Sequence, residues 1–134
     1  VKTFFDDYSP APIACMMMDL DFYSSTINAF QILENNNSHF LPRVYCYFDD
    51  LFGTEYEAYH EFGGERLAIT EFNKNHPTKK IAQLLGLKYK RRIPSVWNDQ
   101  IYLVHDFTHP KYSQYCHPDD TNSRSHCQLD HNRF

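Results

Sequence analysis

The sequence predicts an α/β fold that contains two parallel strands, and three observations indicate this. Residues 13–18, Ile-Ala-Cys-Met-Met-Met, form an unbroken run of apolar or small residues, typical of a strand buried on both faces of a parallel sheet. A second run of this kind occupies residues 44–48. The segment between them, residues 26–33, has the apolar spacing of a helix. Two strands separated by one helix predict a right-handed βαβ unit.

The remaining elements before and within this unit follow from local spacing. Four apolar residues at i, i+3, i+4 and i+7 predict a helix over residues 1–8: Val1, Phe4, Phe5 and Tyr8. The run Ser-Pro-Ala-Pro at residues 9–12 ends that helix. The hydroxyl residues at positions 24–26 are expected to cap the helix over residues 26–33, and residues 35–38 to form a loop.

The second half of the chain is expected to add two helices and a strand pair. Residues 62–75 have four inward-facing positions typical of a helix: Leu67, Ala68, Ile69 and Phe72. A further helix is predicted from Pro77 to a stop at Gly86. Residues 89–93 and 100–107 are predicted to be strands, and the short loop between them permits only antiparallel pairing.

Composition limits the class of protein and its partners. We expect one domain over residues 1–112 and a polar C-terminal tail over residues 113–134. The formal net charge of −4 argues against a nucleic-acid partner, and the basic run at residues 88–92 is interpreted as a solvated edge strand. The absence of a signal-like or membrane-spanning segment predicts no membrane partner. Four cysteines without secretory features predict reduced thiols and a cytoplasmic location, with Cys15 and Cys46 packed inside strands.

Carboxylates follow both predicted parallel strands. Asp19 and Asp21 come directly after the first strand, and Asp49 and Asp50 after the second. Parallel strands carry these acids to the same edge of the sheet, which is where open α/β sheets bind their ligands. Mg²⁺ prefers carboxylate and water oxygens, so the pattern predicts a divalent-cation site that orients a substrate hydroxyl. The alternative is structural: Asp21 caps the next helix, and Asp49 and Asp50 form a turn.

An apolar strand followed by Asp-x-Asp also occurs in phosphatases of the haloacid-dehalogenase family, where the first Asp is the nucleophile. That family places a Ser or Thr strand end and a Lys between the Asp-x-Asp and a later Asp-Asp pair. Here no Lys lies between Asp21 and Asp49, and only one helix and a loop separate them. The sequence therefore disfavours a phosphatase.

Five stretches resemble the C-terminal half of class I S-adenosylmethionine-dependent methyltransferases, in particular the metal-dependent group similar to macrocin O-methyltransferase. The first two are Asp-Leu-Asp-Phe-Tyr-Ser-Ser-Thr at residues 19–26 and Leu-Pro-Arg-Val-Tyr-Cys-Tyr-Phe-Asp-Asp at residues 41–50. The others are at residues 64–73, 97–102 and 105–110, so the resemblance spans residues 11 to about 112. It implies a Rossmann-like sheet of seven strands, of which this chain supplies strands four and five and an antiparallel pair.

The resemblance also implies a site. Asp19, Asp49 and Asp50 match the family's metal ligands for Mg²⁺ or a similar cation, and Asp19 matches the catalytic base for the acceptor hydroxyl of a small metabolite or sugar. Asp21 matches an acid with a capping or outer role. The family holds S-adenosylmethionine through strands one to three and a Gly-rich loop, whereas this sequence has no Gly-x-Gly. We therefore expect that an N-terminal half is missing, or that another chain or a homo-oligomer covers the exposed strand edge.

Two alternatives remain beside an enzyme. One is a non-catalytic α/β domain that associates through its exposed strand edge. The other is a zinc-binding scaffold, because imidazole and thiolate groups gather near the C-terminus: His105, His109, Cys116, His117, His126, Cys127 and His131. Their spacing fits no regular zinc finger, which favours an incidental composition of the tail.

Overall fold

The computed structural model describes residues 2–53 and 59–114. It contains three α-helices in this range: α1 (Lys2–Tyr8), α2 (Tyr23–Phe30) and α3 (Gly64–Asn75). Four strands accompany them: β1 (Ile13–Met18), β2 (Phe40–Phe48), β3 (Lys79–Gln83) and β4 (Ile101–Asp106). Short 3₁₀ turns occupy Gln31–Glu34, Asn37–His39, Leu87–Lys90 and Val96–Gln100. The predicted tail lies outside the described residues from position 115 onward.

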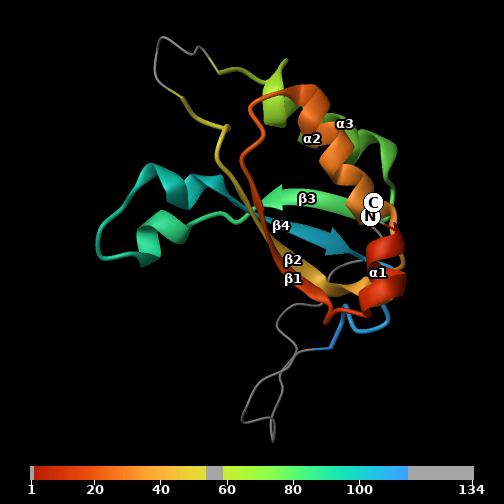
Figure 1. The fold of residues 1–134 in the computed structure, drawn as a ribbon. Coiled ribbons are helices and arrows are strands. Elements are labelled where there is room, and N and C mark those ends of the chain that lie inside the picture. Colours follow the sequence, from red (N-terminus) through yellow and green to blue (C-terminus); the bar gives the residue numbers. More distant parts are fainter. Residues whose placement is uncertain (1, 54–58, 115–134) are drawn as a thin grey trace, which may run out of the picture.

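The four strands form one mixed sheet in the order β1-β2-β4-β3 (Figure 1). β1 and β2 are parallel, with Met18 opposite Phe48. β4 lies antiparallel to both β2 and β3. The prediction of an α/β fold with two parallel strands is therefore confirmed, but the antiparallel pair forms between β4 and β3 and not between β4 and residues 89–93.

The core lies between the sheet and two helices. α2 and α3 lie next to each other over one face of the sheet (Figure 1). The ring of Phe30 in α2 contacts Phe48 of β2 edge-on at a centroid distance of 6.1 Å and Phe72 of α3 at 5.4 Å. All three rings are at most 3% exposed. The burial of these large rings fixes how the helices sit on the sheet and so positions the ends of β1 and β2.

The prediction that the first strand is buried on both faces is wrong. Met18 is 7% exposed and belongs to the core, whereas the neighbouring Met17 is 74% exposed. Successive side chains point to opposite faces of a strand, and the described helices α2 and α3 cover only one of these faces. For the same reason Cys46 is buried and Cys15 is exposed, so the expectation of a packed thiol is confirmed only for Cys46.

The predicted helix from Pro77 to Gly86 is instead strand β3. Ile81 has the spacing of a helix face with Leu84 and Leu85, but tertiary partners determine its conformation. Its backbone N–H donates to Asn73 Oδ1 at 2.7 Å, and its carbonyl accepts from Asn73 Nδ2 at 2.8 Å. These bonds from α3 hold an extended segment against β4, so pairing outweighs the local helical pattern.

The predicted strand at residues 89–93 is also wrong. Residues 87–90 form a 3₁₀ turn, and β3 takes the place beside β4 that this segment was expected to occupy. Because β2 already pairs with the other edge of β4, the sheet offers residues 89–93 no neighbouring edge there. Gly86 adopts a left-handed conformation with φ of 82°, which turns the chain after β3 rather than after a helix.

Helix α2 begins three residues earlier than predicted, and no side chain caps it. Its N-cap is Phe22 in an extended conformation. The expected hydroxyl cap is absent because the N-cap residue is Phe, so residues 24–26 lie inside the helix, where the Thr26 hydroxyl donates to the Phe22 carbonyl at 2.9 Å. Thr26 is fully buried, so this bond satisfies its hydroxyl within the core.

His105 should make stability fall at acidic pH. Its Nδ1 lies 2.7 Å from the Tyr112 hydroxyl, and burial, together with the charge of Arg43, lowers the pKa of His105 below its ordinary value of 6.5. Lys80 lies opposite His105 on β3 and adds a like charge on that side. A lowered folded pKa means that the unfolded chain binds more protons below pH 6.5, so the free energy of unfolding decreases as the pH falls. Urea unfolding over this range should show a smaller decrease for His105→Phe than for the wild type.

The control is His60→Gln, which replaces an exposed imidazole and shows how far the loss of any one histidine changes the slope. An unchanged slope in His105→Phe would contradict the assignment.

Candidate metal centre

The two parallel strands end side by side and bring their acids to one edge of the sheet, as predicted. The Asp49 N–H donates to the Met18 carbonyl at 3.0 Å, which extends the ladder one residue beyond the paired strands. Asp19 follows β1 directly, and Asp49 and Asp50 follow β2. The carboxylates therefore lie at the carboxyl ends of neighbouring parallel strands, the usual place for a ligand in such sheets.

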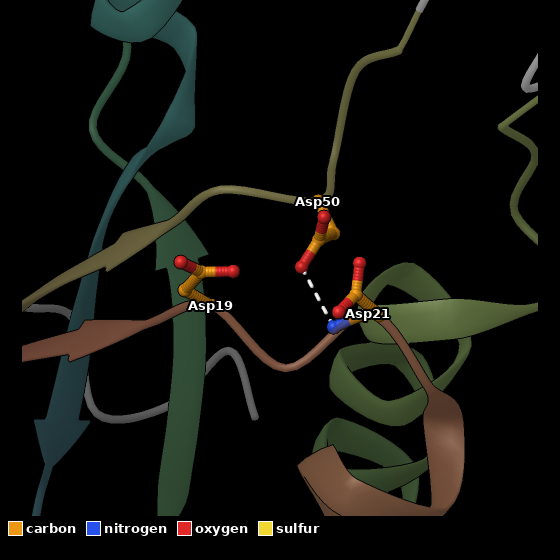
Figure 2. Close-up of side chains that lie close together, drawn as sticks. All are labelled: Asp19, Asp21 and Asp50. Atoms are coloured by element: carbon orange, nitrogen blue, oxygen red, sulfur yellow. Dashed lines mark hydrogen bonds between the residues drawn. The ribbon is translucent and has the colours of Figure 1, made fainter.

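Three carboxylates gather there: those of Asp19, Asp21 and Asp50 (Figure 2). One oxygen from each lies within 4.8 Å of the others. Asp19 and Asp21 are exposed, and Asp50 is 8% exposed. The structure thus joins two of the three expected ligands, Asp19 and Asp50, and adds Asp21.

Asp49, the third expected ligand, does not belong to this cluster. Its Oδ1 accepts a hydrogen bond of 2.7 Å from the Tyr47 hydroxyl. Tyr47 and Asp49 are two residues apart, so they share the face of the strand opposite to that of Phe48 and Asp50. The alternation of side chains along β2 separates the adjacent acids, and the oxygen that joins those of Asp19 and Asp21 comes from Asp50.

Asp50 accepts hydrogen bonds that connect the end of β2 to the turn after β1. Its Oδ2 accepts from the backbone N–H of Leu20 at 3.1 Å. The same oxygen accepts from the backbone N–H of Asp21 at 2.7 Å (Figure 2). Its Oδ1 accepts from the Tyr59 hydroxyl at 3.3 Å. Bonds from two successive N–H groups tie the end of β2 to the turn after β1 and fix where the Asp50 carboxylate lies.

Asp21 occupies a backbone conformation that most residues avoid. Its φ is 52°, in the left-handed region, and the Phe22 N–H donates to the Leu20 carbonyl across it. Asp tolerates this region better than most residues do. Gly64 packs beside this turn and is itself left-handed, with φ of 54°; a Cβ there would make an ordinary contact of 3.5 Å with the Asp21 carbonyl oxygen. The tight turn aims the Asp21 side chain back at the strand ends.

Substitutions at Asp21 should separate backbone strain from cation binding. Asp21→Ala puts a Cβ into the left-handed region and should unfold about 1 kcal/mol more easily than Asp21→Gly, which adopts that region freely. Both variants remove the carboxylate and should weaken Mn²⁺ binding equally. Urea unfolding and Mn²⁺ titration followed by electron paramagnetic resonance measure the two effects. Equal stability of the two variants would show that φ at this position carries no strain.

Glu65 lies behind the cluster, in the first turn of α3. It is fully buried, and its Oε2 accepts from the Asp50 N–H at 3.1 Å. Its Oε1 has no hydrogen-bond partner among the described residues. Burial is the main cause that raises the pKa of Glu65 to about 8, and the charges of Asp50, Asp49 and Asp19 add to it, whereas the bond from the Asp50 backbone opposes the rise. Glu65 anchors Asp50 from the helix side, and the sequence reasoning did not identify it.

Tyr47 and Gln100 were also not identified from the sequence, and they hold Asp49. Gln100 Nε2 donates to the Asp49 carbonyl at 2.6 Å, and Gln100 Oε1 lies 3.2 Å from the Tyr47 hydroxyl. The bond to Asp49, followed by burial and the charges of three aspartates, raises the pKa of Tyr47 to about 12. Tyr47 therefore keeps its proton and remains a donor to Asp49.

The donor set fits a divalent cation. Mg²⁺ binds oxygens at about 2.1 Å, so two of its ligands lie at most about 4.2 Å apart, and for Ca²⁺ the limit is about 4.8 Å or slightly more. The three oxygens lie within 4.8 Å of one another, so one divalent cation of this kind could contact all of them. Exposed Asp19 and Asp21 leave room for water or a substrate oxygen on the open side.

Most of the histidine and cysteine residues named for a zinc site fall outside the residues that the structure describes. Within the described residues, His105 bonds to Tyr112, and His109 Nδ1 accepts from the Lys111 N–H at 3.1 Å. The other five residues named for a zinc site lie outside the described range. The zinc scaffold therefore stays a prediction.

Comparison of the chain with protein-family models, curated proteins and solved structures gave no match in any of the three. Among the described residues, none of the helices combines the length and the apolar character that crossing a bilayer requires.

Proposed function

We propose that this chain forms the cation- and acceptor-binding part of a metal-dependent O-methyltransferase. One observation carries the proposal: carboxylates from the ends of two adjacent parallel strands converge within 4.8 Å. The sequence resemblance to the macrocin O-methyltransferase group supplies the reaction class. The substrate class is a small molecule, such as a sugar, that presents a hydroxyl group.

Each acid has a distinct role in this proposal. Asp50, fixed by two backbone donors, holds the cation together with Asp21 and Asp19. Asp19 is exposed at the end of β1, and its carboxylate can also reach an incoming hydroxyl, from which it removes the proton. A bound divalent cation supplies Lewis acidity that lowers the pKa of that hydroxyl. Asp49 keeps Tyr47 in place at the rim of the site.

S-adenosylmethionine does not fit the residues of this chain alone. The four glycines are Gly53, Gly63, Gly64 and Gly86, and they form no Gly-rich loop of the kind that the family uses. The proposed role of the chain therefore ends at the acceptor hydroxyl, and a second set of residues would hold the methyl donor.

Two binding measurements test the proposal in parts. Mn²⁺ titration followed by electron paramagnetic resonance should show one site that Asp19→Asn weakens, while Asp6→Asn, an exposed acid on α1, leaves it unchanged. Failure of Mn²⁺ to bind would overturn the cation site. Calorimetry with S-adenosylhomocysteine and a methyl-transfer assay would be carried out on this chain together with a partner that binds the methyl donor. Lack of methyl transfer there, with Mn²⁺ bound, would overturn the reaction class alone.

A second candidate is a non-catalytic domain that associates through its sheet. Within the described residues, no strand pairs with the outer edge of β1, and Met17 and Tyr45 are 74% and 52% exposed on the sheet. Unpaired edges and exposed apolar side chains favour association. Sedimentation velocity tests this: concentration-dependent dimers that Met17→Lys abolishes support it, and a monomer at all concentrations contradicts it.

A further inference from the structure

The connection between β3 and β4, residues 84–100, projects from the body of the sheet (Figure 1). It contains the two 3₁₀ turns Leu87–Lys90 and Val96–Gln100. We call residues 85–97 the basic loop. Five of its apolar side chains are exposed: Leu85 at 79%, Tyr89 at 83%, Ile93 at 78%, Val96 at 63% and Trp97 at 42%. Such a density of exposed apolar side chains in one short segment indicates a contact surface.

The basic loop is also strongly cationic. It carries Lys88, Lys90, Arg91 and Arg92, and residues 84–98 contain no Asp or Glu, although the whole chain has a net charge of −4. Two cations lie against its aromatic rings: Lys88 is 5.6 Å from the centroid of Tyr89, and Arg91 is 5.9 Å from that of Trp97. Positive charge and exposed apolar groups thus share the same surface.

The base of the basic loop is held firmly. The Leu84 N–H donates to the Ile101 carbonyl at 2.9 Å, and Gln83 Nε2 donates to the Asp99 carbonyl at 2.8 Å. Lys88 forms an ion pair of 3.3 Å with Asp99. The apolar and cationic side chains are therefore presented by an anchored turn and not by a loose segment.

We propose that the basic loop binds peripherally to an anionic lipid surface, with its cations at the headgroups and its apolar side chains in the interface. Aromatic and basic residues together are typical of segments that lie at the boundary between lipid and water. Single-stranded nucleic acid would use the cations and the two aromatic rings, but it gives no role to exposed Leu85, Ile93 and Val96. Protein interfaces are depleted in Lys relative to the rest of the surface, whereas this segment carries Lys88 and Lys90. An anionic lipid surface gives a role to both groups of side chains, because its headgroups attract the cations and its interface accepts the apolar groups.

Lipid binding by the basic loop would not require the proposed reaction or the cation site. The earlier expectation of no membrane partner concerned segments that span a membrane, whereas the basic loop would bind at its surface. The chain would lie on a membrane without crossing it.

Vesicle co-sedimentation of the whole chain tests the inference. Vesicles of phosphatidylcholine with phosphatidylserine should bind the protein, and vesicles of phosphatidylcholine alone should not. Each cation at the surface contributes roughly a factor of five, so Arg91→Gln with Arg92→Gln should weaken binding roughly 25-fold. Tyr89→Ser with Ile93→Ser should weaken it at least about tenfold, because both side chains are exposed and available for insertion.

The matched control removes two exposed cations elsewhere, Lys74→Gln with Lys111→Gln, and should change binding less than either loop variant. All substituted side chains are exposed, so circular dichroism should confirm unchanged folding. Absence of binding to anionic vesicles, or equal binding to neutral ones, overturns the inference. Loss of binding in the arginine variant without any effect of the Tyr89 and Ile93 substitutions also overturns it and indicates a general polyanion site, which a single-stranded oligonucleotide would then compete for.

Discussion

Asp50→Ala is expected to weaken divalent-cation binding by more than about a hundredfold and to lower the free energy of unfolding by about 3 kcal/mol. The carboxylate accepts hydrogen bonds from two backbone N–H groups and from the Tyr59 hydroxyl. Alanine leaves these donors without their acceptor and removes the innermost ligand of the cluster. Mn²⁺ titration and urea unfolding measure the two losses separately.

Two further variants sharpen this test. Asp50→Asn retains a side-chain oxygen for the Leu20 and Asp21 N–H groups. It should therefore lose most of the cation affinity, but less than half of the unfolding free energy that Asp50→Ala loses. Asp49→Asn tests the ligand set that the sequence resemblance implies. If Asp49 stays with Tyr47, as in the structure, its substitution should change Mn²⁺ affinity by less than about threefold. A loss as large as that of Asp50→Ala would mean that Asp49 turns into the site when the cation binds.

Glu65→Ala should have the next largest effect, a loss of about 3 kcal/mol in the free energy of unfolding. The side chain is fully buried, so its removal leaves a cavity beneath the acidic cluster, and the Asp50 N–H loses its acceptor at 3.1 Å. Asp50 would then keep only the bonds of its side chain to Leu20, Asp21 and Tyr59, and Mn²⁺ affinity should fall about tenfold. Urea unfolding and Mn²⁺ titration report on these two effects.

Glu65→Gln distinguishes the hydrogen bond from the charge. Glutamine has nearly the same shape and keeps an oxygen for the Asp50 N–H, so stability should stay within about 1 kcal/mol of the wild type and Mn²⁺ should still bind. Glu61→Ala, an exposed acid just before α3, serves as the control for a simple change of charge. If Glu65→Gln lost cation binding as fully as Glu65→Ala, Glu65 would act through its charge and not by positioning Asp50.

Strand β1, strand β2 and helix α3 could be predicted because their patterns are long and locally consistent. The apolar run of residues 13–18 and the following acids also predicted the edge of the sheet at which the carboxylates meet. Strand β3 could not be predicted, since the side chain of Asn73, on a different element, satisfies the backbone of Ile81. A local helical pattern carries no information about such a partner.

The candidate site was predicted in outline, and its internal geometry was not. The pair Asp49 and Asp50 looked equivalent as strand-end acids, but the alternation of side chains along β2 gives them opposite faces. The signal for Asp50 was present: it continues the inward series of Val44, Cys46 and Phe48. Glu65 had a comparable signal, because it stands three, four and seven residues before Ala68, Ile69 and Phe72 on the buried face of α3. A carboxylate on an apolar stripe needs a partner, and here it is the backbone of Asp50.

The position of β1 at the border of the described sheet has a consequence for the exchange of its amide hydrogens with solvent. The Met18 carbonyl accepts from Asp49, so the backbone groups of Met18 and Met16 face β2, while those of Met17 face outward. Amides bonded within a ladder exchange slowly, and those that face water exchange rapidly. Deuterium uptake resolved by residue should therefore alternate along β1, and slow exchange at Met17 would reveal that another strand has joined this edge.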